Sequence, residues 1–233
     1  MKGKIIVIEG TDCSGKATQT KLLKENLEKL GYPVFQMSYP CYDTPTGKII
    51  GGPYLGKESI CDGWFSETAP HVEPKVGILY YAADRFYNLP KLLEKQKEGY
   101  VILLDRYTYS NMAHQGGKIS DSKKRDEMYE WISKLEFEML GLPEPEIKLF
   151  LHMNSEGEKL LKQNRVEEKS DEHERNETHI KNAETAYFEI SEKYGFTIFE
   201  CHKKLPIQNL NDIKTPKEIS KEILDCVLEK LKN

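Results

Sequence analysis

Long apolar runs are missing from this sequence. No apolar stretch approaches the roughly 20 residues that a membrane-spanning helix needs, so we expect no membrane partner. A signal peptide is also missing, because Met1-Lys2-Gly3-Lys4 leads directly into Ile5-Ile6-Val7-Ile8, an apolar run of strand length. Internal repeats and low-complexity linkers are absent as well. We therefore expect a cytoplasmic protein whose 233 residues form a single domain, 1–233.

Cysteine pairs and an excess of positive charge are lacking too. The cysteines are odd in number and form no Cys-x-x-Cys pair: Cys13, Cys41, Cys61, Cys201 and Cys226. That usage argues against a disulfide framework and against a zinc site. The formal net charge is −4, whereas proteins that bind nucleic acid without specificity usually present a basic face. We therefore expect no nucleic-acid partner.

What the sequence does contain is an alternation of short β-branched runs with helical patterns. The predicted strands are Lys4–Glu9, Pro33–Ser38, Tyr100–Asp105, Ile147–His152 and Phe196–Cys201. The predicted helices are Lys16–Leu30, Pro74–Lys97, Lys123–Leu140, Glu156–Gln163, Glu177–Tyr194 and Pro216–Leu231. Such alternation is typical of a parallel sheet with helices on both faces. The predicted fold is therefore α/β, with three layers around a five-stranded parallel sheet.

Two stretches depart from this alternation. Asp43–Trp64 is rich in Gly, Pro and Tyr, which predicts an irregular loop with at most one short helix. Asn164–Asn176 is almost wholly polar and lies between two helical patterns. By composition alone it is typical of a solvated junction between helices.

A phosphate-binding motif follows the first predicted strand. Gly10-Thr11-Asp12-Cys13-Ser14-Gly15-Lys16 opens the first predicted helix. Glycines let consecutive backbone N–H groups wrap a phosphate, and the helix N-terminus adds a favourable positive end. Lys16 is expected to reach the β- and γ-phosphates of a nucleotide. This context predicts a nucleotide-binding loop and the three-layer fold of P-loop kinases.

The motif lacks the usual hydroxyl residue after its lysine. Ala17 occupies that position, and Thr18 points about 100° away along the helix. A Mg²⁺ ion would then depend on water and carboxylates, with Asp12 and Asp105 as candidates. Asp105 ends a buried strand, where the ligands of doubly wound sheets lie. Arg106 brings a guanidinium to the same edge, where it can pair with phosphate.

The sequence from Lys4 to about Tyr194 resembles the thymidylate kinase family. The resemblance is carried by four segments: Glu9–Thr18, Tyr80-Tyr81-Ala82-Ala83-Asp84-Arg85, Asp105-Arg106-Tyr107-Thr108-Tyr109-Ser110-Asn111, and Asp171-Glu172-His173-Glu174 with the later Tyr187. Tyr81 and Arg85 are four residues apart, so they share one helix face and can hold one flat ligand.

The resemblance implies a kinase that transfers the γ-phosphate of ATP to dTMP with Mg²⁺, and a homodimer. It implies a nucleotide loop running from Gly10 to Thr18, and a lid at about 164–176. Arg165 or Arg175 would reach the transferred phosphate, and Glu174 would lie near the metal. The implied substrate site comprises Asp12, Tyr39, Pro40, Tyr81, Arg85, Arg106, Ser110, Asn111, His114 and Glu174. In it, Tyr81 stacks on thymine, Arg85 and Asn111 contact the base, and Arg106 holds the acceptor phosphate.

Two departures from the family pattern keep other functions open. Tyr39-Pro40-Cys41 stands where the family usually has Phe-Pro-Arg, and His114 stands where members often carry an aromatic beside the deoxyribose. One alternative is another nucleoside or nucleoside monophosphate kinase. A nucleoside kinase would need a carboxylate after the second strand, where no acid occurs before Asp43. The other alternative is a catalytically weak P-loop module that only binds nucleotide.

Overall fold

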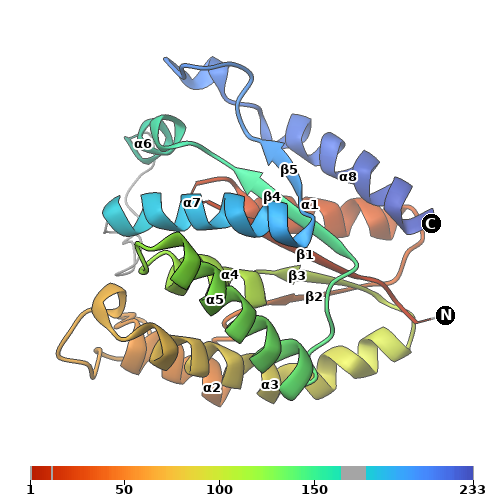
Figure 1. Ribbon diagram of the computed structural model, residues 1–233. Coiled ribbons are helices and arrows are strands. Elements are labelled where there is room, and N and C mark those ends of the chain that lie inside the picture. Colours follow the sequence, from red (N-terminus) through yellow and green to blue (C-terminus); the bar gives the residue numbers. More distant parts are fainter. Residues whose placement is uncertain (1, 12, 164–176, 233) are drawn as a thin grey trace.

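The computed structural model describes residues 2–11, 13–163 and 177–232, and its centre is a parallel sheet (Figure 1). The strands are β1 (Ile5–Gly10), β2 (Val34–Ser38), β3 (Val101–Asp105), β4 (Ile147–His152) and β5 (Thr197–Glu200). They are ordered β2-β3-β1-β4-β5, and every neighbouring pair is parallel. The predicted five-stranded sheet is therefore confirmed, with strand ends that differ by at most one residue.

Helices cover both faces of this sheet (Figure 1). In the described residues the α-helices are α1 (Lys16–Lys29), α2 (Pro45–Ile49), α3 (Pro74–Lys97), α4 (Thr108–Gly116), α5 (Ser122–Ser133), α6 (Ser155–Gln163), α7 (Glu177–Tyr194) and α8 (Pro216–Lys232). Helices α1 and α8 cover one face, whereas α3, α4, α5 and α7 cover the other. The three-layer arrangement is thus confirmed.

Strand β1 shows why its sequence is continuously apolar. Ile5 and Val7 pack into the core beneath α3, α4 and α7, and Ile6 and Ile8 pack into the core beneath α1 and α8. All four side chains are fully buried. A strand that is buried on both faces needs apolar residues at every position instead of alternate ones.

Helix α4 was missed in the sequence because it lacks an exposed polar face. Seven of its nine residues are buried, including the polar residues Thr108, Asn111 and Gln115. The period of 3.6 residues that marks a surface helix is therefore absent from Thr108–Gly116.

The predicted helix Lys123–Leu140 is divided in the structure. Helix α5 ends at Ser133, and the π-helix η3 (Lys134–Met139) continues the chain with a wider turn. The wider turn shifts the direction of the following side chains, and Glu136 becomes completely buried.

The segment between β2 and α3 has a small core of its own. Helix α2 runs into the π-helix η1 (Ile50–Tyr54), and the 3₁₀-helix η2 (Ala69–His71) follows. The predicted irregular loop is therefore partly helical. Its core consists of Ile50, Tyr54, Leu55, Ala69 and Val72, against which Phe65, Tyr80 and Tyr81 pack.

Another short 3₁₀-helix, η4 (Leu210–Asp212), precedes α8. In the described part of the chain, we find no helix that is long and apolar enough to cross a membrane. The predicted lid at 164–176 lies outside the described residues.

Candidate functional site

The phosphate loop runs from the end of β1 to the start of α1. Gly15 precedes the helix with a φ of 78°, a conformation that glycine adopts without strain. Gly10 is required by close packing, because a Cβ there would lie 2.9 Å from the carbonyl oxygen of Leu151. Lys16 Nζ donates to the Gly10 carbonyl oxygen at 3.2 Å. The loop thus presents a helix N-terminus and an ammonium group at one edge of the sheet.

Thr11 fastens this loop to the chain that leaves β4. Its hydroxyl donates to the Met153 carbonyl oxygen at 2.9 Å and accepts from the Met153 amide at 2.8 Å. The Thr11 amide also donates to Leu151 at 3.1 Å. The side chains of Ala17 and Thr18 are exposed on the first turn of α1, and Asp12 lies outside the described residues.

Glu9 connects the strand before the phosphate loop to two helices, and the sequence analysis assigned it no role. Its carboxylate is completely buried. Oε1 accepts from the amides of Tyr107 and Ser110 at 2.8 and 3.0 Å, and Oε2 accepts from the hydroxyls of Ser110 and Tyr187. Burial raises the pKa of Glu9, and the nearby charges of Arg106 and Lys16 oppose that rise. An acid at the end of an apolar strand is visible in the sequence, but it does not indicate these distant partners.

Arg106 lies beside this carboxylate with Ser110 and His114. Its backbone has a φ of 65°, which is uncommon for a residue with a side chain and tends to mark functional positions. Nη1 donates to Ser110 Oγ at 3.4 Å and lies 3.2 Å from His114 Nε2. The structure thus brings together three residues of the predicted substrate site.

The loop after β2 is held in place by Asp84 of α3. This carboxylate is buried, and it accepts from the Cys41 amide at 2.8 Å and from Thr46 Oγ1 at 2.7 Å. Burial, together with the charge of Asp84, raises the pKa of Cys41 to about 12, so its thiol stays protonated. Tyr39 is buried, and its ring centroid lies 5.8 Å from that of Tyr107.

Tyr81 and Arg85, which were predicted to clasp one ligand, have different surroundings. Tyr81 is half-buried and packs edge-on against Tyr54, with ring centroids 5.9 Å apart. Arg85 is 2% exposed, and its guanidinium pairs with both carboxylate oxygens of Glu136. Asn111, at 3% exposure, donates to the same carboxylate at 3.0 Å. Their contact with a base stays a prediction.

Comparison with known proteins identifies the group to which this site belongs. A sequence model of the family described as thymidylate kinase matches residues 8–212. The chain belongs to the thymidylate kinase family.

Individual members of the thymidylate kinase family match over shorter stretches. The thymidylate kinase of Homo sapiens is 31% identical over 152 residues, which are 65% of this chain and 62% of that protein. The probable thymidylate kinase of Thermococcus kodakarensis is 42% identical over 113 residues, or 47% and 52% of the two chains. The matched region therefore spans about half to under two thirds of the length of these relatives.

A solved structure shows the same fold. The thymidylate kinase of Candida albicans superposes with a TM-score of 0.71 at 20% identity, over 98% of this chain and 92% of the other. At that identity the likeness concerns the fold alone.

In this member of the thymidylate kinase family, Asp105 is the only predicted metal ligand within the described residues. It ends β3 and pairs in register with Ile8 of β1. Among the described residues, no three His, Cys, Asp or Glu side chains are arranged to hold a metal ion. Asp12 and Glu174 lie outside that part, as do Arg165 and Arg175.

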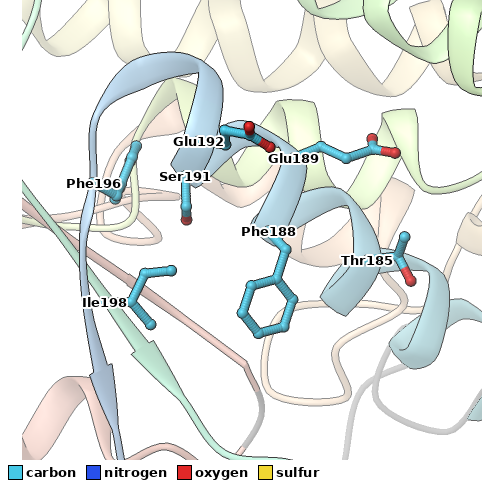
Figure 2. A pocket seen from close by; sticks show the side chains of 7 residues that line it. All are labelled: Thr185, Phe188, Glu189, Ser191, Glu192, Phe196 and Ile198. Carbon is cyan, nitrogen blue, oxygen red and sulfur yellow. The ribbon is translucent and has the colours of Figure 1, made fainter.

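A pocket of about 550 Å³ opens at the surface of the protein, and Figure 2 shows the side chains that line it. It is formed between α7 and β5, and its lining residues are Thr185, Phe188, Glu189, Ser191, Glu192, Phe196 and Ile198. None of these lining residues is a predicted site residue of this chain.

His152 holds α7 and β5 to the end of β4, next to the phosphate loop. Its Nε2 lies 2.7 Å from Glu184 Oε1 and its Nδ1 lies 2.6 Å from Glu200 Oε2. Burial alone would lower the pKa of His152, but the hydrogen bonds to Glu184 and Glu200 outweigh it and raise the pKa above 6.5. The imidazolium therefore stabilises the fold.

The pH dependence of this contribution has a definite sign. Because the folded-state pKa is raised, the contribution is complete below pH 6.5, the unfolded value, and is lost as the pH rises through the folded pKa. We expect wild type to exceed His152→Gln in free energy of unfolding by more at pH 5.5 than at pH 8.5, measured by urea denaturation. A difference that does not change with pH would contradict this assignment.

Proposed function

We propose that the protein transfers the γ-phosphate of ATP to dTMP, giving dTDP and ADP. The observation that carries this proposal is the Glu9 carboxylate, which joins the strand before the phosphate loop to the segment bearing Arg106 and Ser110. The phosphate loop and Arg106 thereby lie at the neighbouring carboxyl ends of β1 and β3, where a donor and an acceptor nucleotide could meet. Membership of the thymidylate kinase family supports the same reaction.

The donor half consists of the loop from Gly10 to Thr18. Its amides and the N-terminus of α1 would bind the phosphates of ATP, and Lys16 would hold the charge of the group in transit. We propose that the stretch Cys201–Lys214 after β5 contacts the adenine. In support, Cys201 Sγ lies 3.6 Å from the carbonyl oxygen of Ser14 in the loop.

The acceptor half is formed by the chain after β2, by α3 and by α4. Arg106 would pair with the phosphate of dTMP, with Ser110 and His114 keeping its guanidinium in place. Tyr81 would stack on the base, a contact worth roughly 1–3 kcal/mol. Arg85 and Asn111 would bond to its edge.

The residues present fit a Mg²⁺ ion, because Asp105 supplies a carboxylate oxygen at the edge of the sheet. Asp12 and Glu174 are the other proposed ligands. When bound, Mg²⁺ would supply positive charge that offsets the charge of the phosphates. We propose that the residues 164–176 close over the site and exclude water, with Arg165 or Arg175 at the transferred phosphate.

We also propose that the protein acts in the cytoplasm as a homodimer. Support for the dimer comes from the outer side of α3, where Leu79, Phe86 and Leu93 are 53%, 50% and 40% exposed. They recur every seven residues and so form one apolar stripe along the helix, which a second copy can cover.

The proposed reaction is tested by a screen of nucleotides. We expect Mg²⁺-dependent formation of ADP from ATP to be faster with dTMP than with dCMP, dGMP or AMP at equal concentration. Thymidine serves as the control for a nucleoside kinase. A preference for a purine monophosphate would contradict the assignment of dTMP as the substrate. A preference for thymidine would indicate a nucleoside kinase. Tight ATP binding with no turnover would indicate the non-catalytic module.

Removing either predicted cation should slow the reaction. We expect Lys16→Ala and Arg106→Ala each to lower the rate of transfer by roughly two to five orders of magnitude. Arg106→Ala should also weaken the binding of dTMP, measured by calorimetry, whereas Lys16→Ala acts on the donor. Lys21→Ala, at an exposed position of the same helix α1, is the control. An Arg106→Ala enzyme within about twofold of wild type in rate and affinity would refute its role.

Cys41 is the departure from the family pattern that bears most directly on rate. Because Asp84 fixes the Cys41 amide, we expect Cys41→Arg to place a guanidinium near the acceptor phosphate. A charge-assisted bond of about 1.5–3 kcal/mol should then tighten the binding of dTMP. Cys41→Leu adds volume without charge and should give no gain. If Cys41→Arg leaves rate and affinity unchanged, residue 41 is remote from the phosphates.

A further inference from the structure

Glu136 belongs to none of the sequence motifs, yet it accepts hydrogen bonds from both predicted base contacts, Arg85 and Asn111. It is 0% exposed on the π-helix η3, and each of its carboxylate oxygens accepts two hydrogen bonds. Oε1 accepts from Arg85 Nη2 at 2.7 Å and from Asn111 Nδ2 at 3.0 Å. Oε2 accepts from Arg85 Nε at 2.5 Å and from Thr108 Oγ1 at 2.8 Å. All four sites that a carboxylate offers are therefore used.

These bonds decide which way the amide of Asn111 points. Its nitrogen lies near two groups that can only accept, the carboxylate of Glu136 and the carbonyl oxygen of Ile78 at 3.2 Å. The atom facing them must therefore be the Nδ2 donor, and Oδ1 must point the other way. Oδ1 is buried and has no hydrogen-bond partner within the described residues.

Arg85 is fixed in the same manner. Its Nε and Nη2 bind the carboxylate in bidentate fashion, and Nη1 donates to the Tyr107 carbonyl oxygen at 3.3 Å. A guanidinium has five N–H groups, and three are used by these contacts, so donors remain. Glu136 thus holds a guanidinium from α3 and an amide from α4 at one carboxylate.

We propose that Glu136 is a positioning residue that makes the site select thymine over cytosine. The inference rests on the proposed function, in which Arg85 and Asn111 contact the base. Thymine offers an acceptor at O4 and a donor at N3–H, which match a guanidinium donor and an amide oxygen. Cytosine offers a donor at N4 and an acceptor at N3. Its N4 donor would face the guanidinium donor of Arg85, and its N3 acceptor would face the amide oxygen of Asn111. Glu136 cannot donate, and this forbids the rotation of Asn111 that would suit cytosine.

The near-complete burial of Arg85 and Asn111 does not alter this selection. Any opening of neighbouring side chains that a base requires is a change in the protein itself, so its cost enters kcat/KM for both substrates. It therefore cancels from the ratio of kcat/KM for dTMP to kcat/KM for dCMP. Any loss of folded enzyme cancels from the ratio as well, because both substrates meet the same active fraction.

The test compares this ratio between wild type and Glu136→Gln. Glutamine has the size of glutamate, but its amide can donate to the Oδ1 of a rotated Asn111, so that only the Ile78 carbonyl oxygen still opposes the rotation. We expect the ratio to fall by about ten- to a hundredfold, the discrimination that a mismatched donor–acceptor pair supplies. Phe137→Leu is the control, because Phe137 packs on Tyr107 and Tyr109 from the same π-helix. It should loosen the segment and leave the ratio unchanged.

A second variant keeps the test decisive if Glu136→Gln does not fold. Thr108→Val removes one of the four hydrogen bonds that hold the carboxylate, and no charge. Because the carboxylate is then held less firmly against Asn111, the ratio should fall by about three- to tenfold. A ratio within about twofold of wild type in the folded variant would overturn the inference and leave the dTMP kinase standing. If wild type itself does not prefer dTMP, the proposed function fails, and the positioning role fails with it.

Discussion

The arrangement of the site depends on the carboxylate of Glu9. A buried carboxylate is stable only when its oxygens receive hydrogen bonds, and here these come from the start of α4 and from Tyr187 of α7. Glu9 thus connects three parts of the chain by hydrogen bonds. They are the strand before the phosphate loop, the segment that follows Arg106, and helix α7. Any movement of one relative to the others would leave a charge without partners.

Asp84 and Glu136 repeat this arrangement around helix α3. Asp84 holds the chain after β2, and Glu136 holds α3 to α4. Each is buried, and each accepts hydrogen bonds from residues that are far apart in the sequence. Three buried carboxylates therefore define the relative positions of β1, the chain after β2 and helices α3, α4 and α7. Apolar packing alone, which has no direction, would not do so.

The sequence predicted the layers of the fold and the phosphate loop, because these depend on local patterns. Apolar runs such as Ile5–Ile8 and the glycines around Lys16 carry their meaning within a few residues. Helix α4 was missed because it is buried nearly all round, and η3 was missed because a π-turn has no simple period. The roles of Glu9 and Glu136 depend on partners up to 178 and 51 residues away, so no local pattern could indicate them. The family model confirms the resemblance, and the individual site residues stay predictions.

The separate core of the segment between β2 and α3 has a consequence for how the protein opens. Its five buried residues form a cluster apart from the two cores that flank the sheet. The free energy for local opening of such a unit is set by its own contacts and is lower than that for global unfolding. Amide hydrogens of η1 should then exchange with solvent while those of β1 remain protected. Mutations within this cluster can alter the surroundings of Tyr80 and Tyr81 without disturbing the sheet or the phosphate loop.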